Sequence, residues 1–544
     1  MKNIKHIAAL SIMVMFAACK KDYLDQMPSS NIQAEQVFSN INNTLAYVNT
    51  LYDYLPTWAY TGSNGSLYPI SGATDETWPV WSDYLPAYNV DAITPSNFPL
   101  LSSDWSTYYT AIRACNNFFT YYHLVPANPS QPGERERLKG EAFGLRAFYY
   151  FSLYRAWGAL PLITVPVDPS DVSSTYYPRT SIDSIVNFIV SDLDSAIYYL
   201  PAAYTDQSLD GRVDKTMALA LKSRTLLYYA SPLSNPSNNI ARWQAAAAAS
   251  LQALDTALAN GYTLAANYND IFSQYLNQEV IFGTVMSNHG IDQVTQSTGE
   301  GGWGDCGPLQ DFVDSYEMQA TGLPITNPNS GFNPNHPYTG RDPRFYSTVI
   351  YPGEVWKSQK IDIYGKDQNV SNAFSGYWWR KYVSPTGNLI NGTGFVTNTW
   401  VLFRTGELYL NYAEAQNEAV GPDATVYSAV NAIRTRAGMP NLPAGYSQSQ
   451  MRSAIQLERK IELAFEGNRF WDVRRWEIAN VTNVGPVHRV AYTVSGIDTT
   501  FTYPVLQTRS FTAPRDYLLP IPQDEMNKNR GVNPSFTQNP GWTD

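Results

Sequence analysis

Successive blocks of helical periodicity, most of them closed by a glycine or a proline, are the feature that most restricts how this chain can fold. Within each block apolar residues recur every three or four positions, which places them on one face of a helix. A glycine or proline after such a block is typical of a helix end. We predict helices over residues 32–55, 104–123, 134–157, 181–200, 214–230, 241–260, 404–419, 424–437 and 449–476.

Short turns between these helices predict how they pack. Consecutive helices joined in this way pair with their neighbours, and the spacing is close to the repeat of about 34 residues that is typical of tetratricopeptide proteins. The alanine-rich run over residues 245–249 supplies the small side chains that let helices stack closely. We therefore predict a mainly α fold, an α-solenoid of tetratricopeptide-like helix pairs, and we predict the pairing rather than a register.

Long segments without helical pattern interrupt the helices over residues 56–103, 267–308 and 322–400, with strand-like runs at 279–286 and 345–351. They are rich in Gly, Pro, Asn, Trp and Tyr, and ordered loops of this length are usually functional. We expect one body over residues 31–544. Its helical scaffold covers about 31–55, 104–260 and 404–480, and its loop-rich binding side covers about 56–103 and 267–400.

The charge of the chain is low and acidic. The 544 residues include 37 Lys and Arg and 47 Asp and Glu, which gives a net charge of −10, and charged residues make up 15% of the chain. The usual share is about 25%. Because aromatic residues reach 14%, a largely disordered chain is excluded. The acidic balance also argues against nucleic acid or an anionic membrane face as the main partner.

The first nineteen residues predict export and lipidation. A short basic start precedes an apolar run over residues 7–18, which is shorter than the roughly 20 residues of a membrane span but fits a secretion signal. The run closes with Phe16-Ala17-Ala18-Cys19, the order of a bacterial lipoprotein signal. We predict a signal peptide over residues 1–18, lipidation of Cys19 and a polar tether over 19–30. The alternative is ordinary signal cleavage with an incidental cysteine.

Two cysteines remain in the mature chain. Cys115 lies in a predicted helix beside Ile112 and Phe118, which favours a buried free thiol. Two cysteines do not make a disulfide framework, and the sequence leaves the state of Cys306 open.

Motifs for catalysis or metal binding are weak. No G-x-S-x-G occurs, and the mature chain has only four histidines, far apart: His123, His289, His336 and His488. Residues 299–304 satisfy G-x-G-x-x-G without a strand–turn–helix context, so we interpret them as a ligand loop or a plain turn. Residues 206–211 resemble the start of a calcium loop, but its twelfth position is Met217 rather than Glu. We predict no cofactor and no metal.

The most charged segment covers residues 457–476. Glu458, Glu462 and Glu466 recur every four residues, so they share one face of the predicted helix. The two carboxylates of a glycosidase must flank the bond that they cleave, which one helix face does not provide. We interpret the segment as a buried ion-pair network that fixes the last helix to the body. Its predicted cations are Arg459, Arg469, Arg474 and Arg475.

Aromatic residues in the long loops carry the binding hypothesis. A sugar ring has an apolar C–H face and a rim of hydroxyls, which flat aromatic rings and short polar side chains match. The alternative is that these rings form a small core beneath the loops. We predict that the ligand-binding residues are Trp58, Asp75, Trp78, Trp81, Tyr84 and Trp303.

A series of short blocks also runs in order from Cys19 to the C-terminus. They are Trp105-x-x-x-Tyr109-x-x-Ile112-x-x-x-Asn116, Glu141-Ala-Phe-Gly-Leu-Arg-Ala-Phe-Tyr-Tyr-Phe151, Trp157-Gly-Ala-Leu-Pro-Leu162, Gly301-Gly-Trp-Gly304, Arg341-Asp-Pro-Arg-Phe345, Arg404-x-x-Glu407-x-Tyr-Leu-Asn-Tyr-Ala-Glu-Ala415, Asn431-x-Ile-Arg-x-Arg-Ala-Gly438, Glu458-Arg-x-Ile-Glu-Leu-Ala-Phe-Glu-Gly-x-Arg-Phe-x-Asp472, Leu519-Pro-Ile-Pro522 and Gln538-Asn-Pro-Gly541. Together they resemble the SusD/RagB family of nutrient-binding outer-membrane lipoproteins.

The resemblance implies four tetratricopeptide-like helix pairs on one side of the body and irregular ligand-binding loops on the other. It implies a surface-exposed lipoprotein of the cell outer membrane that binds a nutrient glycan and covers a SusC-like TonB-dependent barrel transporter, without enzymatic activity. Asp75, Trp78, Trp81 and Trp303 fall where the family tends to place ligand contacts. A peptide ligand, a surface glycoside hydrolase and a scaffold that only docks the barrel are the alternatives.

Overall fold

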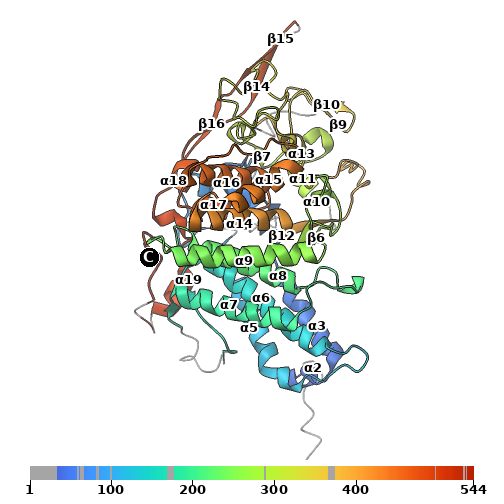
Figure 1. Ribbon diagram of the computed structural model, residues 1–544, viewed down its shortest axis with the longest axis vertical. Helices are drawn as coiled ribbons and strands as arrows, with labels where there is room; N and C mark the ends of the chain where they lie inside the picture. Colours follow the sequence, from blue (N-terminus) through green and yellow to red (C-terminus); the bar gives the residue numbers. More distant parts are fainter. Residues whose placement is uncertain are drawn as a thin grey trace, which may run out of the picture.

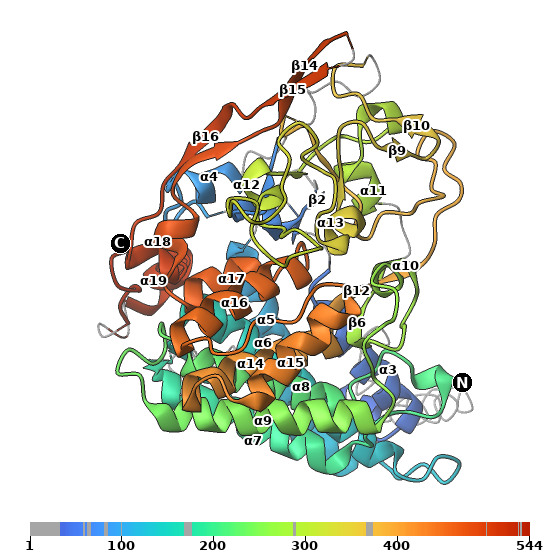
Figure 2. The same ribbon diagram turned by 45° about the horizontal axis from the view of Figure 1, so that its top comes forward.

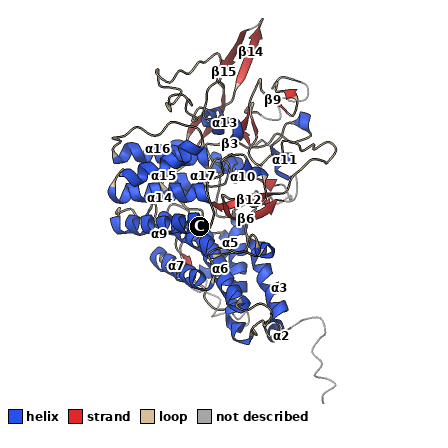
Figure 3. Cartoon of the chain, turned by 45° about the vertical axis from the view of Figure 1, so that its right-hand side comes forward, coloured by secondary structure: helices blue, strands red, loops and turns tan. Residues whose placement is uncertain are grey.

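The computed structural model describes residues 33–57, 60–61, 67–80, 85–98, 101–167, 177–286, 290–365, 374–496, 498–530, 533 and 536–543. The long helices lie in one half of the molecule, and loops with short strands fill much of the other half (Figures 1 and 3). The predicted signal peptide, Cys19 and the tether lie outside the described residues. So do three of the predicted ligand residues, Trp58, Trp81 and Tyr84.

The helical half is a stack in which each helix packs on the next one along the chain. The order of contacts is α5 (Ser102–Tyr121), α6 (Glu134–Trp157), α7 (Ile182–Tyr199), α8 (Lys215–Ala230), α9 (Ile240–Ala259) and then α14 (Thr405–Val420), which also packs on α15 (Ala424–Arg436) and α16 (Gln448–Glu462) (Figure 2). Nearest-neighbour packing of this kind is the mark of a solenoid. The predicted mainly α, tetratricopeptide-like fold is confirmed.

Local signals fix where these helices begin. The side chain of Ser181 accepts from the backbone N–H of Ser184 before α7, and that of Asp214 accepts from Met217 before α8 at 2.7 Å. These are N-caps, which satisfy donors that a helix end leaves unpaired. Alanines line the buried side of α9 at positions 246, 249, 253 and 257, where α8 and α14 approach it.

Two predicted helices are divided in the structure. The first becomes α2 (Ala34–Phe38), α3 (Ile41–Leu51) and a short 3₁₀ turn over residues 52–54, because the Asn40 side chain caps a new helix through the N–H groups of Asn42 and Asn43. The last becomes α16 and α17 (Arg469–Arg475). Between them Phe465 and Gly467 have φ angles of 62° and 80°, which a continuous helix excludes.

The segment between α9 and α14 supplies most of the loop half, and a pair of strands forms its base. Strand β6 (Val280–Met286) pairs antiparallel with β12 (Asn398–Arg404), which confirms the strand predicted at 279–286. Gly283 pairs with Val401, and the carbonyl oxygen of Trp400 would lie 2.3 Å from a Cβ atom at position 283, so only glycine fits. The strand predicted at 345–351 is largely wrong. Asp342 caps a helix there, α13 (Pro343–Thr348), and only β8 (Val349–Ile350) is extended.

The other described strands form small antiparallel pairs, of which the β14–β15 hairpin projects farthest from the helices (Figure 1). The pairs are β1 (Tyr60–Thr61) with β2 (Leu67–Tyr68), β3 (Thr77–Trp78) with β7 (Gly307–Pro308), β4 (Leu160–Pro161) with β5 (Arg179–Thr180), β8 with β11 (Trp378–Trp379), β9 (Val355–Trp356) with β10 (Gln359–Lys360), β13 (Gly485–His488) with β16 (Val505–Arg509), and β14 (Ala491–Ser495) with β15 (Asp498–Thr502).

Short helices complete the description. They are α4 (Leu85–Asn89), α10 (Asp270–Ser273), α11 (Gly290–Thr295), α12 (Gln310–Val313), α18 (Ala479–Thr482) and α19 (Gln523–Arg530), with 3₁₀ turns η3 (Ile70–Ala73), η4 (Tyr122–Leu124), η6 (Gln207–Leu209), η7 (Thr298–Glu300) and η8 (Arg515–Tyr517). The η6 turn occupies the calcium-like segment, where Asp206 accepts from the N–H of Ser208. Within the described ranges, no helix is both long and apolar enough to cross a bilayer. Cys115 and Cys306 are buried free thiols, as predicted for Cys115.

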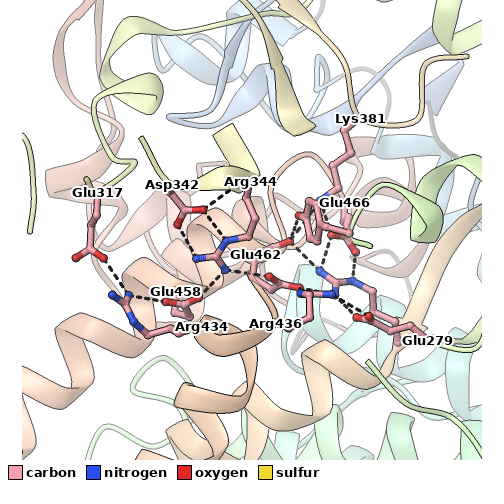
Figure 4. A network of polar contacts seen from close by, with 12 residues as sticks. Glu279, Glu317, Asp342, Arg344, Lys381, Arg434, Arg436, Glu458, Glu462 and Glu466 are labelled. Carbon is pink, nitrogen blue, oxygen red and sulfur yellow. Dashed lines mark hydrogen bonds and ion pairs between the residues drawn. The ribbon is translucent and has the colours of Figure 1, made fainter. Parts of the chain in front are cut away.

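A buried ion-pair network joins the two halves (Figure 4). Arg404 ends β12 and donates to carboxylate oxygens of Glu279, Glu462 and Glu466 at 2.6, 2.7 and 2.8 Å. Arg344 from α13 pairs with Glu458 at 2.5 Å and with Glu462 at 3.0 Å. Burial alone would raise the pKa of Glu462, but Arg436, Arg404 and Arg344 hold that pKa well below its usual range. The network therefore ties β6, β12, α13 and α16 together as charged partners.

The sequence predicted this network but assigned wrong partners to the three glutamates. Their cations come from distant segments, namely Arg344, Lys381, Arg404, Arg434 and Arg436. The arginines close to them in sequence bind elsewhere. Arg459 and Arg475 pair with Asp472, Arg469 pairs with Asp75, and the Arg474 guanidinium lies 3.5 Å from the centre of the Phe470 ring. For Arg469, Arg474 and Arg475 the reason is that they lie in α17, after the turn at 463–467, and so are not on the α16 helix.

We expect Arg404→Met to lower the free energy of unfolding by about 3–5 kcal/mol, because it leaves buried carboxylates without their cation. Arg452→Met is the matched control. Its pair with Glu418 is at the surface, the Arg452 side chain being 43% exposed, so its loss should cost less than about 1 kcal/mol. Urea denaturation of both variants checks this. Equal losses would contradict the role given to the network.

Candidate functional site

The two aromatic loops predicted to bind a ligand meet at one place in the loop half. Strand β3 carries Trp78 and pairs with β7, in the register Trp78 to Gly307. The N–H of Leu309 donates to the carbonyl oxygen of Glu76 at 2.9 Å, and the N–H of Val80 donates to the Asp305 carboxylate. The segment over residues 74–80 and the loop that contains Trp303 therefore form one surface, although more than two hundred residues separate them in sequence.

Asp75 fastens this surface to the helical half. Its two carboxylate oxygens each accept from Arg469 at 2.8 Å, and Lys460 lies 3.0 Å away. Burial would raise the pKa of Asp75, but these two cations hold it well below its usual range. Both oxygens are thus engaged by the protein. The structure shows an anchoring contact for Asp75, and its predicted contact with a ligand stays a prediction.

Glu76 contacts the helical half as well, at the turn between α16 and α17. Its carboxylate accepts from the N–H of Phe465 at 3.1 Å and from the Thr74 hydroxyl at 3.2 Å. Burial, and then the neighbouring charge of Asp75, raise the pKa of Glu76 to about 7. The end of α16, the turn after it and the start of α17 therefore help to hold the 74–80 segment, through Lys460, the Phe465 N–H and Arg469.

Trp303 presents its ring to solvent from a tightly bonded loop. Its side chain is 46% exposed. The backbone N–H of Trp303 donates to the carbonyl oxygen of Gln293 at 2.7 Å, and the side-chain amide of Gln293 donates to the carbonyl oxygen of Gly301 at 2.9 Å. A Cβ at Gly302 would lie 2.4 Å from the carbonyl oxygen of Gln296, so the loop folds this closely onto α11 only with glycine there.

The G-x-G-x-x-G segment is this same loop. Residues 299–304 begin within η7 and end before β7, not between a strand and a helix, so the context of a dinucleotide site is missing. Of the two predicted interpretations, a ligand loop or a plain turn, the structure shows a turn whose backbone is held by hydrogen bonds and whose one large side chain points outward.

Neighbouring loops extend this surface. Glu300 pairs with Lys357 at 3.1 Å, and Lys357 also donates to the carbonyl oxygen of Gly387 at 2.7 Å. Gly301 lies against Leu389 and Ile390, and the Ile390 side chain is 77% exposed. We call Trp303, Ile390 and the loop over 301–304 the Trp303 shelf. Sequence reasoning missed Ile390, because one aliphatic residue in a Gly- and Asn-rich loop gives no periodic signal.

The structure places the remaining predicted residues as follows. Trp78 is half-buried and packs against the core, close to the shelf through the β3–β7 pair. Trp58, Trp81 and Tyr84 lie outside the described residues, so their place at the site stays a prediction. Among the residues that the structure describes, no cluster of His, Cys, Asp and Glu could hold a metal ion.

The arrangement provides a surface that a ligand can contact. A half-exposed indole offers a flat apolar surface to a ligand. Such a surface matches the C–H face of a ring. The fold and site together define an α-solenoid that carries an inserted, rigidly fastened loop half.

Comparison with known proteins identifies the family. A model of the SusD family matches residues 259–542, and a second model, described as starch-binding associating with outer membrane, matches residues 22–227. Because the first match covers more than half of the chain, the protein belongs to the SusD family. The predicted resemblance is confirmed.

Individual relatives agree with this assignment. A SusD-like protein of Formosa agariphila is 25% identical over 463 residues, 81% of each chain. The crystal structure of a SusD-like protein of Bacteroides fragilis has a TM-score of 0.78 with 26% identity, covering 95% of this chain and 100% of that one. A laminarin-binding SusD-like protein has a TM-score of 0.65 with 22% identity, covering 92% and 100%.

We expect the stability of the protein to fall between about pH 5 and pH 7 because of Glu76. Its pKa is near 7 in the folded state and near 4.5 when exposed, so the folded state binds the proton more tightly and loses stability as the pH rises through this window. The loss is at most about 1.4 kcal/mol per pH unit.

The check is the difference in unfolding free energy between the wild type and Glu76→Gln, measured in urea from pH 5 to pH 8. The free energy of unfolding of the variant should rise relative to that of the wild type as the pH rises, since the amide stays neutral. Glu35→Gln, at an exposed position of α2, is the control and should follow the wild type. Parallel curves for Glu76→Gln and the wild type would show that Glu76 is not the group responsible.

Proposed function

We propose that this protein is a surface-exposed outer-membrane lipoprotein that binds a nutrient glycan and delivers it to a SusC-like TonB-dependent transporter. The observation that carries the proposal is the Trp303 indole, presented to solvent on a loop whose backbone is fixed by hydrogen bonds. The ligand sites on this chain are Trp303 and Trp78, extended by Trp58, Trp81, Tyr84 and Asp75. No cofactor or metal takes part.

A rigid indole favours binding because little conformational freedom is lost when the ligand arrives. Each aromatic contact contributes roughly 0.5–1.5 kcal/mol beyond the area that it buries. A few such contacts give weak affinity, about −4 to −8 kcal/mol, which corresponds to millimolar to micromolar dissociation constants. Weak binding suits a protein that must release its ligand to a transporter.

The relatives support a glycan over a peptide. The laminarin-binding SusD-like protein takes a polysaccharide and has the same fold over its whole length. The model that matches residues 22–227 is described as starch-binding. Transfer of this ligand class to the present chain is part of the proposal, and the sugar and its linkages are not specified by it.

Binding without catalysis is supported by the state of the carboxylates that suggested a hydrolase. Glu458, Glu462 and Glu466 are buried, and each is paired with at least two cations. None of them is available to flank a glycosidic bond. This segment therefore does not offer the pair of free carboxylates that a glycoside hydrolase needs.

Anchoring through Cys19 is supported by the position of the first described helix. In Figure 1, α2 lies at the end of the molecule opposite the β14–β15 hairpin, so a tether before residue 33 joins the helical end. A lipid on Cys19 then holds the helical half toward the membrane and leaves the loop half outward.

We expect Trp303→Ala to weaken binding of the preferred oligosaccharide about tenfold, or ~1.4 kcal/mol, because the flat apolar contact is lost. Isothermal titration of the purified mature protein against a panel of oligosaccharides and peptides provides the measurement. Tyr198→Ala is the control, since Tyr198 is an exposed aromatic on α7 in the helical half. An unchanged affinity in Trp303→Ala would remove the shelf from the site, and no glycan binding at all would refute the proposed function.

We expect Cys19→Ser to move the protein from the membrane fraction to the soluble fraction, because no other acylation site is proposed. Cell fractionation measures this, and protease treatment of intact cells shows whether the wild type is exposed at the surface. Retention of Cys19→Ser in the membrane fraction at the wild-type level would refute the anchor.

A further inference from the structure

A cavity of about 150 Å³ lies close to the Trp303 shelf and shares no residue with it. Residues of α10 and of β9, in the loop half, contribute to its walls. Lys357, the residue after Trp356, is bonded to Glu300 and to Gly387, so the cavity and the shelf adjoin. Its walls are Asn269, Phe272, Ser273, Trp356, Arg380, Lys381, Tyr382, Val383 and Pro385. We call it the Trp356 pocket.

The pocket has the size and shape for one ring. A protein cavity of about 150 Å³ accommodates benzene, a six-membered ring. Phe272, Trp356 and Tyr382 form a buried aromatic floor, while Asn269 and Pro385 are exposed at the rim. Aromatic walls with polar groups at the edge are the usual composition of a sugar subsite.

Three buried polar groups in these walls have no hydrogen-bond partner, namely two N–H groups, of Trp356 and Arg380, and the hydroxyl of Tyr382. The Trp356 side chain is only 7% exposed, and its indole N–H is buried without a partner. The Nε–H of Arg380 is likewise buried without a partner, and the Arg380 guanidinium lies 4.6 Å from the centre of the Trp356 ring. Buried donors left unpaired cost about 1–3 kcal/mol each, so a ligand that offers acceptors here relieves that cost.

The charge of the walls selects the kind of acceptor. Both charged residues that line the pocket are cations, Arg380 and Lys381, in a chain of net charge −10. The Lys381 ammonium is directed to Glu466 at 2.7 Å (Figure 4), and Arg380 pairs through another nitrogen with Glu354, but neither acid lines the pocket. An oxyanion accepts from the two unpaired N–H groups, and from the Tyr382 hydroxyl, without needing to donate, which a ligand hydroxyl does not match as well.

We propose that the Trp356 pocket binds a single sugar ring that carries an oxyanion, either a carboxylate or a sulfate ester. The oxyanion accepts from the Trp356 indole N–H and from the Arg380 Nε–H, and the ring lies against Phe272 and Tyr382. This inference rests on the proposed function, because it takes the ligand to be a glycan. It adds that the preferred glycan is acidic and that one acidic residue is recognised beside the Trp303 shelf.

The test compares ligands that differ only in the charged group. Uronic-acid oligosaccharides are titrated into the wild-type protein beside their carboxyl-reduced, neutral counterparts, and sulfated oligosaccharides beside their desulfated ones. We expect one of the two acidic series to bind about tenfold more tightly than its neutral partner, because charge-assisted hydrogen bonds are the strong ones. The arm that shows the preference identifies the source of the oxyanion.

Two variants locate the effect. Trp356→Phe keeps an aromatic ring and removes one donor, so the preference for the acidic ligand should fall severalfold. Arg380→Gln removes the charge and should abolish the preference. Trp303→Ala is the matched control, which should weaken acidic and neutral ligands to the same extent. Thermal melting of each variant confirms that it is folded.

The outcomes separate this inference from the proposed function. Equal binding of acidic and neutral partners in the wild type overturns the inference and leaves glycan binding standing. A preference that persists unchanged in Trp356→Phe and Arg380→Gln also overturns it. Failure of every glycan, neutral or acidic, to bind refutes the proposed function and the inference with it.

Discussion

The ion pairs around Glu462 are the interaction on which the rest of the structure depends. Glu462 ends α16, and its carboxylate meets guanidinium groups from β12, α13 and α15. Taking so many charges out of water is unfavourable unless every one is paired, so these segments are held to one mutual arrangement. Where the helix stops at Glu462, the chain turns, and that turn supplies Phe465 and Arg469 to hold Glu76 and Asp75. The aromatic surface is thus positioned by a charged junction beneath it.

Charged and aromatic residues have different roles in this structure. Many charged side chains lie in the interior, where the low dielectric strengthens each ion pair and so fixes the relative position of its two partners. Aromatic side chains work both inside, as in the stacked pair of Trp379 and Phe465 at 4.4 Å, and at the surface, as Trp303 does. This explains how a chain with few charged residues still orders a long inserted segment. The charges are few, but many of them are buried at the junction.

The sequence predicted the helices well where signals are local. The helix over residues 134–157 was placed at its observed ends, because an acidic first turn and a terminal glycine mark it. The break at 463–467 was missed, since the glutamate spacing continues across it and only Gly467 marks the turn. The strands over 485–509 were not predicted, although their alternation of Thr with Val, Tyr and Phe is the pattern of an exposed hairpin.

The site was harder to predict than the fold for a physical reason. The types of residue were visible in the sequence, and Trp303 was singled out for its ring in a glycine-rich loop. Partners were not visible, because Asp75 pairs with Arg469 across 394 positions and no spacing rule connects them. The donors of the Trp356 pocket, Trp356 and Arg380, are significant only because they meet across a cavity, which sequence order does not reveal.

The inserted position of the loop half has a consequence for how such proteins diversify. Its two ends are brought together by β6 and β12, which pair along their length at its root. Once a root of this kind is closed, lengthening the chain between its ends adds little entropy loss, about 0.6 kcal/mol for each doubling of a flexible loop. Insertions and deletions beyond the root that keep Arg344 and Lys381 in place therefore leave the solenoid undisturbed. One scaffold of this design can change the part of its recognition surface that lies between β6 and β12 and keep its helices unchanged.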